Sequence, residues 1–216
     1  MTKRSIPRKS QAELLCQMLR LFYDKGWVAG TGGGICAATG PNTALMAPTG
    51  VHKETVAPSD LFVVNRKDGT VLRRARNRSL AVSECNPIFC AVMSLRAAGS
   101  VMHSHALSAV LAADLAGGRD HLIIEELEML KGLRGVSNQS KHAVPVIHNT
   151  ARERELEDQI RGALANPAYR ESYGILVRNH GAYIWGEDIW ETKRHAEIYH
   201  FLFEAVVARS QRKPTP

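Results

Sequence analysis

The feature of this chain that most restricts its fold is the distribution of short apolar segments between helical ones. Eight segments of four to six residues have the pattern of β-strands, at 35–39, 43–47, 61–65, 70–73, 100–105, 144–148, 175–178 and 182–185. Five segments have helical periodicity, at 10–25, 86–98, 106–116, 151–165 and 188–208. They follow no strict strand–helix–strand rhythm, which favours a mostly antiparallel sheet covered by helices.

Turn residues join the predicted strands in pairs. Gly40-Pro41-Asn42 and Lys67-Asp68-Gly69 predict two hairpins, and Asn179-His180-Gly181 joins a third pair of strands. Residues 122–131 are ambiguous. No repeat, low-complexity tract or interior linker divides the chain, so we expect a single domain over 1–216 with short basic tails at about 1–9 and 209–216.

The net charge of +7 lies in these two ends. Residues 13–204 are formally neutral, and the excess comes from Lys3, Arg4, Arg8, Lys9, Arg209, Arg212 and Lys213. A nucleic-acid-binding protein more often carries a basic face on its folded body, interleaved with aromatic side chains. We therefore expect no nucleic-acid partner.

The chain also lacks the signals of a membrane or secreted protein. No apolar stretch approaches the ~18 residues of a membrane span, and the basic start leads into a segment with polar residues every third or fourth position. Four cysteines are too few for a disulfide scaffold of this size, so we interpret them as reduced thiols of a cytoplasmic protein.

Three histidines are candidates for a metal site. Side chains at i and i+2 of a strand point to the same face, so His103 and His105 can reach one point, and His180 follows another apolar strand. Three neutral imidazoles with an open position are typical of catalytic zinc. The spacing alone does not exclude a chance pattern, because the chain has nine histidines. The other six are interpreted as surface or core residues.

Three further segments have both a functional and a structural interpretation. The glycine-rich stretch 30–34 offers unobstructed backbone N–H groups for an oxyanion, but it lacks the dinucleotide and P-loop patterns and alone is more often a tight turn. Thr49-Gly50 with Lys53 supplies a hydroxyl, an N–H and a cation. The basic loop 73–78 is either a solvated turn or a positive rim that attracts a phosphorylated substrate.

Taken in order, six motifs resemble those of the class II aldolase/adducin family, and in particular a subgroup of dehydratases that act on a phosphorylated ketose. The resemblance runs from the first helix to the last. The motifs are Gly30-Thr31-Gly32-Gly33-Gly34-Ile35, Ala47-Pro48-Thr49-Gly50-Val51-His52-Lys53-Glu54, Ser83-Glu84-Cys85-Asn86-Pro87, Val101-Met102-His103-Ser104-His105, Glu128-Met129-Leu130-Lys131-Gly132 and 176–186.

The resemblance implies an α/β/α sandwich around a mostly antiparallel sheet, assembly as a homotetramer with the active site near a subunit boundary, and one zinc ion per subunit. It assigns the zinc ligands to His103, His105 and His180. It assigns catalysis to Glu128 and Cys85. The segments it assigns to the substrate phosphate contain Gly32, Gly33, Gly34, Thr49, Gly50, Lys53 and Ser83.

Within this assignment, Glu128 is our candidate acid, because a carboxyl enclosed by neighbouring apolar side chains has a raised pKa. Cys85 is the candidate base or a substrate-positioning group, and the two roles could be exchanged. Without the resemblance, Cys85 is more simply a buried thiol at a helix start and Glu128 one of several solvated acids.

Two alternatives remain open. The first is a class II aldolase or epimerase acting on another ketose phosphate. Glu84 keeps it open, because it supplies an acid upstream of the histidine pair, but Gly34 stands where the aldolases have asparagine. The second is a non-catalytic, adducin-like interaction module, for which loss of the histidines would be expected. Product analysis separates the first alternative from a dehydratase.

Overall fold

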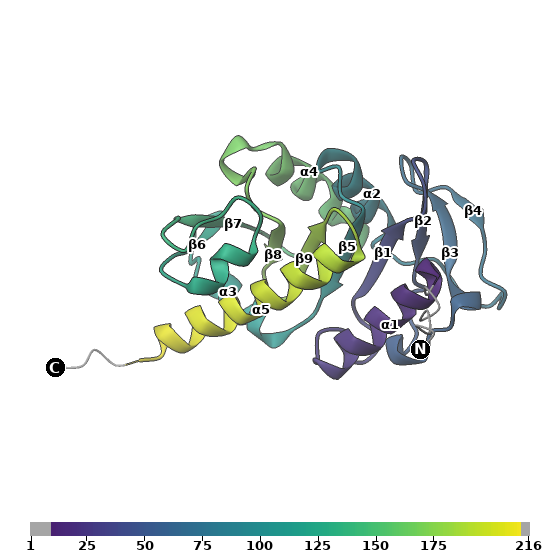
Figure 1. The fold of residues 1–216 in the computed structure, drawn as a ribbon, viewed down its shortest axis with the longest axis horizontal. Helices are drawn as coiled ribbons and strands as arrows, with labels where there is room; N and C mark the ends of the chain where they lie inside the picture. The colour runs from purple at the N-terminus through teal and green to yellow at the C-terminus, as the bar shows by residue number, and fades with distance from the viewer. Residues whose placement is uncertain (1–9, 213–216) are drawn as a thin grey trace, which may run out of the picture.

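The protein, represented by a computed structural model that describes residues 10–212, is built on one nine-stranded sheet with helices on both faces (Figure 1). The strand order is β4-β3-β2-β1-β5-β9-β8-β7-β6. The strands are β1 (Gly34–Ala38), β2 (Thr43–Met46), β3 (Phe62–Asn65), β4 (Val71–Arg73), β5 (Ser100–Ser104), β6 (His121–Ile124), β7 (His142–Ile147), β8 (Gly174–Val177) and β9 (Gly181–Gly186).

Neighbouring strands are antiparallel throughout, except for the parallel pair β7 and β8. Strand β5 lies at the centre of the sheet between β1 and β9. Its residue His103 is paired with Gly34 of β1 on one side and with Tyr183 of β9 on the other. The expected fold, helices around a largely antiparallel sheet, is confirmed.

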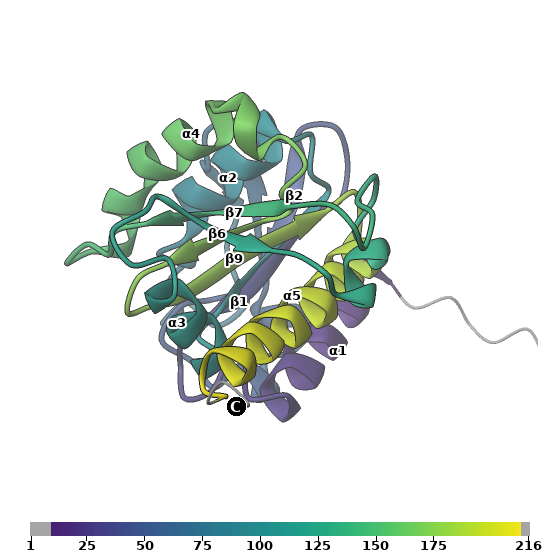
Figure 2. The ribbon, with the colours of Figure 1, turned by 90° about the vertical axis from the view of Figure 1, so that its left-hand side faces the viewer.

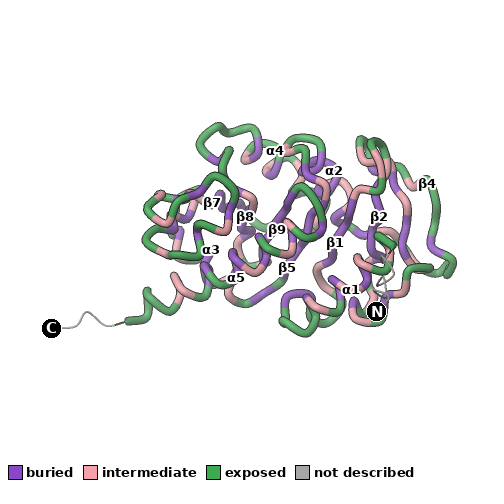
Figure 3. The backbone as a smooth tube through the Cα atoms, in the orientation of Figure 1, coloured by how far each residue is buried: buried purple, intermediate pink, exposed green. Residues whose placement is uncertain are grey.

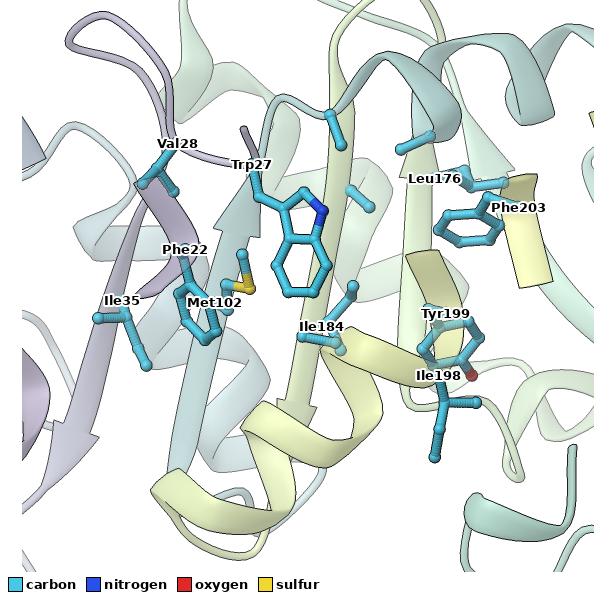
Figure 4. Packing of buried hydrophobic residues seen from close by; sticks show 14 of the residues in the cluster. Phe22, Trp27, Val28, Ile35, Met102, Leu176, Ile184, Ile198, Tyr199 and Phe203 are labelled. Atoms are coloured by element: carbon cyan, nitrogen blue, oxygen red, sulfur yellow. The ribbon is translucent and has the colours of Figure 1, made fainter. Parts of the chain in front are cut away.

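Helices cover the sheet in two layers (Figure 2). One layer contains α1 (Gln11–Asp24), α3 (Leu107–Asp114) and α5 (Ile189–Ser210), and the other contains α2 (Asn86–Leu95) and α4 (Glu157–Ala165). Because side chains alternate along a strand, the sheet supplies a separate apolar cluster to each layer. Figure 4 shows the first cluster, in which Phe22, Trp27 and Met102 lie between α1, α5 and the sheet.

The central strands β5 and β9 are buried along their whole length, as the colouring in Figure 3 shows. The first helix begins where its sequence predicts, because Ser10 and Glu13 form a reciprocal capping box. The ambiguous segment 122–131 contains the end of β6 and the start of a 3₁₀ turn, η3 (Glu128–Gly132). The predicted helix 151–165 begins as a second 3₁₀ turn, η4 (Glu153–Leu156), before α4.

The predicted basic tails lie largely outside the described residues. Cys16, Cys36, Cys85 and Cys90 are free and buried. Within residues 10–212, no helix is long and apolar enough to cross a membrane.

Candidate metal centre

The three histidines come together at one end of the central strands. His103 is the fourth residue of β5, His105 follows the end of that strand, and His180 lies in the turn between β8 and β9. That turn needs left-handed backbone at Asn179 (φ 53°) and a glycine at 181, where a Cβ would collide with the backbone of Ser104. The turn therefore passes directly over the end of β5.

The Nε2 atoms of the three rings converge on one point. They are 2.8 Å apart between His103 and His105, 3.1 Å between His103 and His180, and 3.2 Å between His105 and His180. The His103 ring is completely buried, whereas the other two rings reach the surface. A tetrahedral zinc ion with bonds of about 2.0–2.1 Å separates its donors by about 3.3 Å, so these spacings fit one ion.

The tautomers of two of these rings also fit a cation. Nδ1–H of His103 donates to the Ala182 carbonyl oxygen at 3.1 Å, and Nδ1–H of His180 donates to Oδ1 of Asn149 at 3.0 Å. Because the proton is on Nδ1, each Nε2 presents a lone pair to the centre. Lone pairs that face one another repel unless a cation lies between them. Hydrogen bonds of this kind hold metal-ligating histidines in place.

Sequence reasoning missed the acidic residue at this site, which is Glu153. Its Oε1 lies 2.7 Å from Nε2 of His103 and 3.6 Å from Nε2 of His180. Burial raises the pKa of this carboxyl, whereas positive charge on the histidine side, when these rings carry it, outweighs burial and lowers the pKa overall. Glu153 belongs to the charged run 152–155, whose pattern is typical of a solvated helix face, so no sequence signal distinguishes it.

Tyr183 and Cys85 lie behind Glu153. The Tyr183 ring stacks on the His103 ring with centroids 4.1 Å apart, and its hydroxyl donates to Oε1 of Glu153 at 3.2 Å and lies 3.8 Å from Sγ of Cys85. Burial, and then the charge of Glu153, raise the pKa of the Cys85 thiol well above its usual range. The predicted part of Cys85 in catalysis stays a prediction.

Lys53 is the buried cation of the site. It is 2 % exposed, and its Nζ donates to the carbonyl oxygens of Thr31 at 2.7 Å and Val51 at 3.1 Å. Burial lowers its pKa, although the nearby Cys85 and Glu153 act in the opposite direction. The two carbonyl bonds hold the ammonium group next to the glycine-rich loop.

The glycine-rich loop packs on the histidines. A Cβ at Gly32 would collide with Nδ1 of His105, and Gly33, at φ 67°, would place one 2.7 Å from the His103 carbonyl oxygen. Gly34 pairs with His103 across the β1–β5 ladder. The close approach of backbone to imidazole explains why this stretch is glycine, whether or not it also contacts a phosphate.

The other predicted phosphate contacts lie in the loops before η1 (Lys53–Thr55) and α2. The Thr49 N–H donates to the Ala81 carbonyl oxygen, Gly50 is exposed, and Ser83 Oγ accepts the N–H of Cys85 at 3.2 Å. The arginines of the loop 73–78 are exposed. Their roles toward a phosphate stay predictions.

The apolar enclosure predicted for Glu128 is not found in the single chain. Its side chain is 73 % exposed, and its carboxylate accepts bonds from Lys131 at 2.7 Å and Asn138 at 2.7 Å. The hydrogen bond from Lys131 lowers the pKa of Glu128 instead of raising it. The reason is the geometry of the η3 turn, which buries Leu130 but turns Glu128 outward. Glu128 is not in the group of donors around the histidines.

Comparisons with known proteins agree with the fold and identify the family. The sequence profile of the family described as "Class II Aldolase and Adducin N-terminal domain" matches residues 13–207. A methylthioribulose-1-phosphate dehydratase from Gallus gallus is 36% identical over 209 residues, covering 94% of this chain and 85% of that protein. A "probable bifunctional methylthioribulose-1-phosphate dehydratase/enolase-phosphatase E1" from Physcomitrium patens is 38% identical over 211 residues. That match covers 92% of this chain, which spans only 41% of the longer protein.

Among solved structures, an L-fuculose 1-phosphate aldolase superposes with a TM-score of 0.73 at 17% identity, covering 96% of this chain and 91% of that one. A second L-fuculose-1-phosphate aldolase, from Thermus thermophilus, superposes with a TM-score of 0.64 at 19% identity, covering 93% of this chain and 95% of that one. At these identities the likeness concerns the fold alone.

Proposed function

The chain belongs to the class II aldolase and adducin N-terminal domain family, and from this premise we propose that it is a lyase that dehydrates 5-methylthioribulose 1-phosphate. The product would be 2,3-diketo-5-methylthiopentyl 1-phosphate, an intermediate of methionine salvage. The observation that carries the proposal is the convergence of three imidazole nitrogens in a chain that resembles named dehydratases over almost its whole length.

The reaction determines which groups the protein has to supply. The substrate carries a carbonyl at C2 and hydroxyl groups at C3 and C4. A base removes the proton from C3, the C3–C4 double bond forms, and the C4 hydroxyl leaves as water after an acid protonates it. The resulting enol becomes the second carbonyl, so the product is lighter by one water. The site therefore needs one proton acceptor and one proton donor.

In this proposal His103, His105 and His180 hold one zinc ion per subunit. When bound, the ion offsets the negative charge that develops on the substrate oxygen as C3 loses its proton. The Ala182 carbonyl and Asn149 keep two of the rings in the tautomer that this role requires. Removal of the metal with a chelator should abolish turnover, and added zinc should restore it.

We assign proton transfer to Glu128 and Cys85, with Glu128 as acid at C4 and Cys85 as base or positioning group at C3. Glu128→Gln should abolish turnover while the zinc content stays at the wild-type level. Loss of zinc would contradict the role of proton carrier. For Cys85→Ser the informative measurement is the exchange of the C3 proton with solvent, because unchanged exchange would remove Cys85 from the role of base.

The proposed enzyme is a homotetramer, and this explains how an outward-facing Glu128 can act. Its carboxylate turns away from the histidines of its own chain, so it would serve the site of a neighbouring copy. Exposed apolar side chains such as Leu107, Trp190 and Phe201 are available for contacts between copies. The free cysteines are consistent with a reducing compartment, the cytoplasm.

We propose that the substrate phosphate binds to the glycine-rich loop, Thr49-Gly50, Lys53 and Ser83. Lys53 already gives two of its three N–H bonds to backbone carbonyls, which fixes its charge in place. The exposed basic loop at 73–78 would attract the phosphate from solution.

A further inference from the structure

The acid that touches the histidine cluster is Glu153, and we propose that it is a fourth protein ligand of the metal ion in the substrate-free enzyme. This inference rests on the metal centre of the proposed function. It adds a carboxylate to the three histidines that the sequence predicts. It also gives Tyr183 and Cys85 a defined part, as the groups that hold this carboxylate.

The positions of the donor atoms fit a four-coordinate site. Oε1 of Glu153 lies 2.7 Å from Nε2 of His103 and 3.6 Å from Nε2 of His180. One donor atom from each of His103, His105, His180 and Glu153 lies within 4.8 Å of all the others. In the part of the chain that the structure describes, no other cluster of histidine, cysteine and acidic residues meets that condition. Zinc accepts imidazole nitrogen and carboxylate oxygen with nearly equal bond lengths of about 2.0–2.2 Å.

The positions of the protons on the His103 and His180 rings also favour a metal ion between these rings and Glu153. The His103 and His180 rings donate from Nδ1 to Ala182 and Asn149, so their Nε2 atoms have no proton to give to Glu153. Lone pairs of both rings therefore face a carboxylate oxygen at short distance. Such a contact is repulsive unless a cation joins the atoms, and a metal ion between them turns it into coordination.

Glu153 also has partners on the side away from the histidines. The Tyr183 hydroxyl donates to its Oε1 at 3.2 Å, and the Cys85 thiol bonds the same carboxylate. Glu153 is the first residue of η4, and its side chain is 20 % exposed. Four protein donors would complete a tetrahedral site, so a substrate oxygen would either replace Glu153 or add to it as a fifth ligand. Tyr183 and Cys85 would hold the carboxylate in place in either case.

The test compares Glu153→Gln with Glu155→Gln, an exposed acid of the same turn, as the matched control. Zinc affinity is measured by competition with a chelator, and the coordination of bound cobalt(II) by its visible spectrum. Loss of one ligand should weaken zinc binding at least about tenfold in Glu153→Gln and should change the cobalt spectrum. Glu155→Gln should match the wild type in both measurements.

The inference is overturned if Glu153→Gln keeps both the zinc affinity and the cobalt spectrum of the wild type. If metal-free Glu153→Gln proves unfolded by circular dichroism, Glu153→Asp replaces it. Its shortened carboxylate should alter the cobalt spectrum, and an unaltered spectrum would overturn the inference. A wild-type protein that takes up neither zinc nor cobalt would instead overturn the metal centre itself, a failure distinguishable from that of Glu153 alone.

Discussion

At the scale of single residues, the metal centre depends on the close approach of the glycine-rich backbone to the His105 ring. Gly32 has no positive φ, so alanine would fit its backbone, but the added methyl group would occupy the space of Nδ1 of His105. We predict that Gly32→Ala displaces His105 and weakens zinc binding at least about tenfold, comparable to loss of a supporting contact. The measurement is a chelator competition. Gly118→Ala is the control, because nothing lies within 4 Å of its added methyl group. Equal affinity of the two variants would contradict the prediction.

A second residue-scale prediction concerns the outer support of the site. Asn149 accepts Nδ1–H of His180 at 3.0 Å and fixes that ring. Without this acceptor the ring can rotate or change tautomer, so we expect Asn149→Ala to lower zinc affinity by about 10–100-fold. Asn138→Ala removes a half-buried asparagine that bonds Glu128, outside the histidine cluster, and should leave zinc affinity unchanged. An unchanged affinity in Asn149→Ala would show that His180 is held by other contacts.

At the scale of elements, α5 makes stability depend on pH. His200 of this helix is buried between Trp27 and the Ser104 hydroxyl, and burial lowers its pKa to about 4. In the unfolded chain the same imidazole has a pKa near 6.5, so the unfolded state binds the proton more tightly than the folded state does. The contribution of His200 to stability is therefore complete above pH 6.5 and is lost as the pH falls toward 4. The loss is up to about 3 kcal/mol, from 1.36 kcal/mol per pKa unit.

The measurement is the free energy of unfolding of metal-free protein at pH 7 and pH 5. We expect His200→Gln to be less stable than wild type at pH 7 but to lose less stability on acidification. His52→Gln is the control, since its side chain is exposed, and should keep the wild-type pH dependence. If His200→Gln and wild type lose equal stability between these pH values, His200 is not responsible for the pH dependence.

Most elements could be predicted from the sequence because their patterns are local. Alternating apolar residues and turn glycines place the hairpins, and the capping box at Ser10 places the first helix. The 3₁₀ turns were not predicted, because their three to five residues carry no periodicity. His103 and His105 could be paired from strand geometry alone. Glu153 could not be found, because it reaches them only through the packing of η4 against α2 and α4, which brings its carboxylate next to His103.

At the scale of the whole molecule, the outward direction of Glu128 makes assembly testable. Copies that carry Glu128→Gln retain their histidines, and copies that carry His103→Ala retain Glu128. If each site combines the histidines of one copy with Glu128 of another, either variant alone is inactive. Mixed tetramers formed by co-expression should regain about a quarter of the wild-type activity, since random assembly in a closed ring makes about one site in four complete. Mixtures as inactive as their parents would place Glu128 in its own subunit or outside catalysis.

In the proposed function, this chain removes water from a ketose phosphate with the help of a metal ion held by three histidines. The most direct test is the product formed from 5-methylthioribulose 1-phosphate by purified, zinc-loaded protein, identified by mass spectrometry and NMR. We predict a diketone phosphate lighter than the substrate by one water, and no product after treatment with a chelator. Fragments from carbon–carbon cleavage would contradict the account and identify an aldolase. An unchanged substrate with zinc bound would exclude this ketose as the substrate.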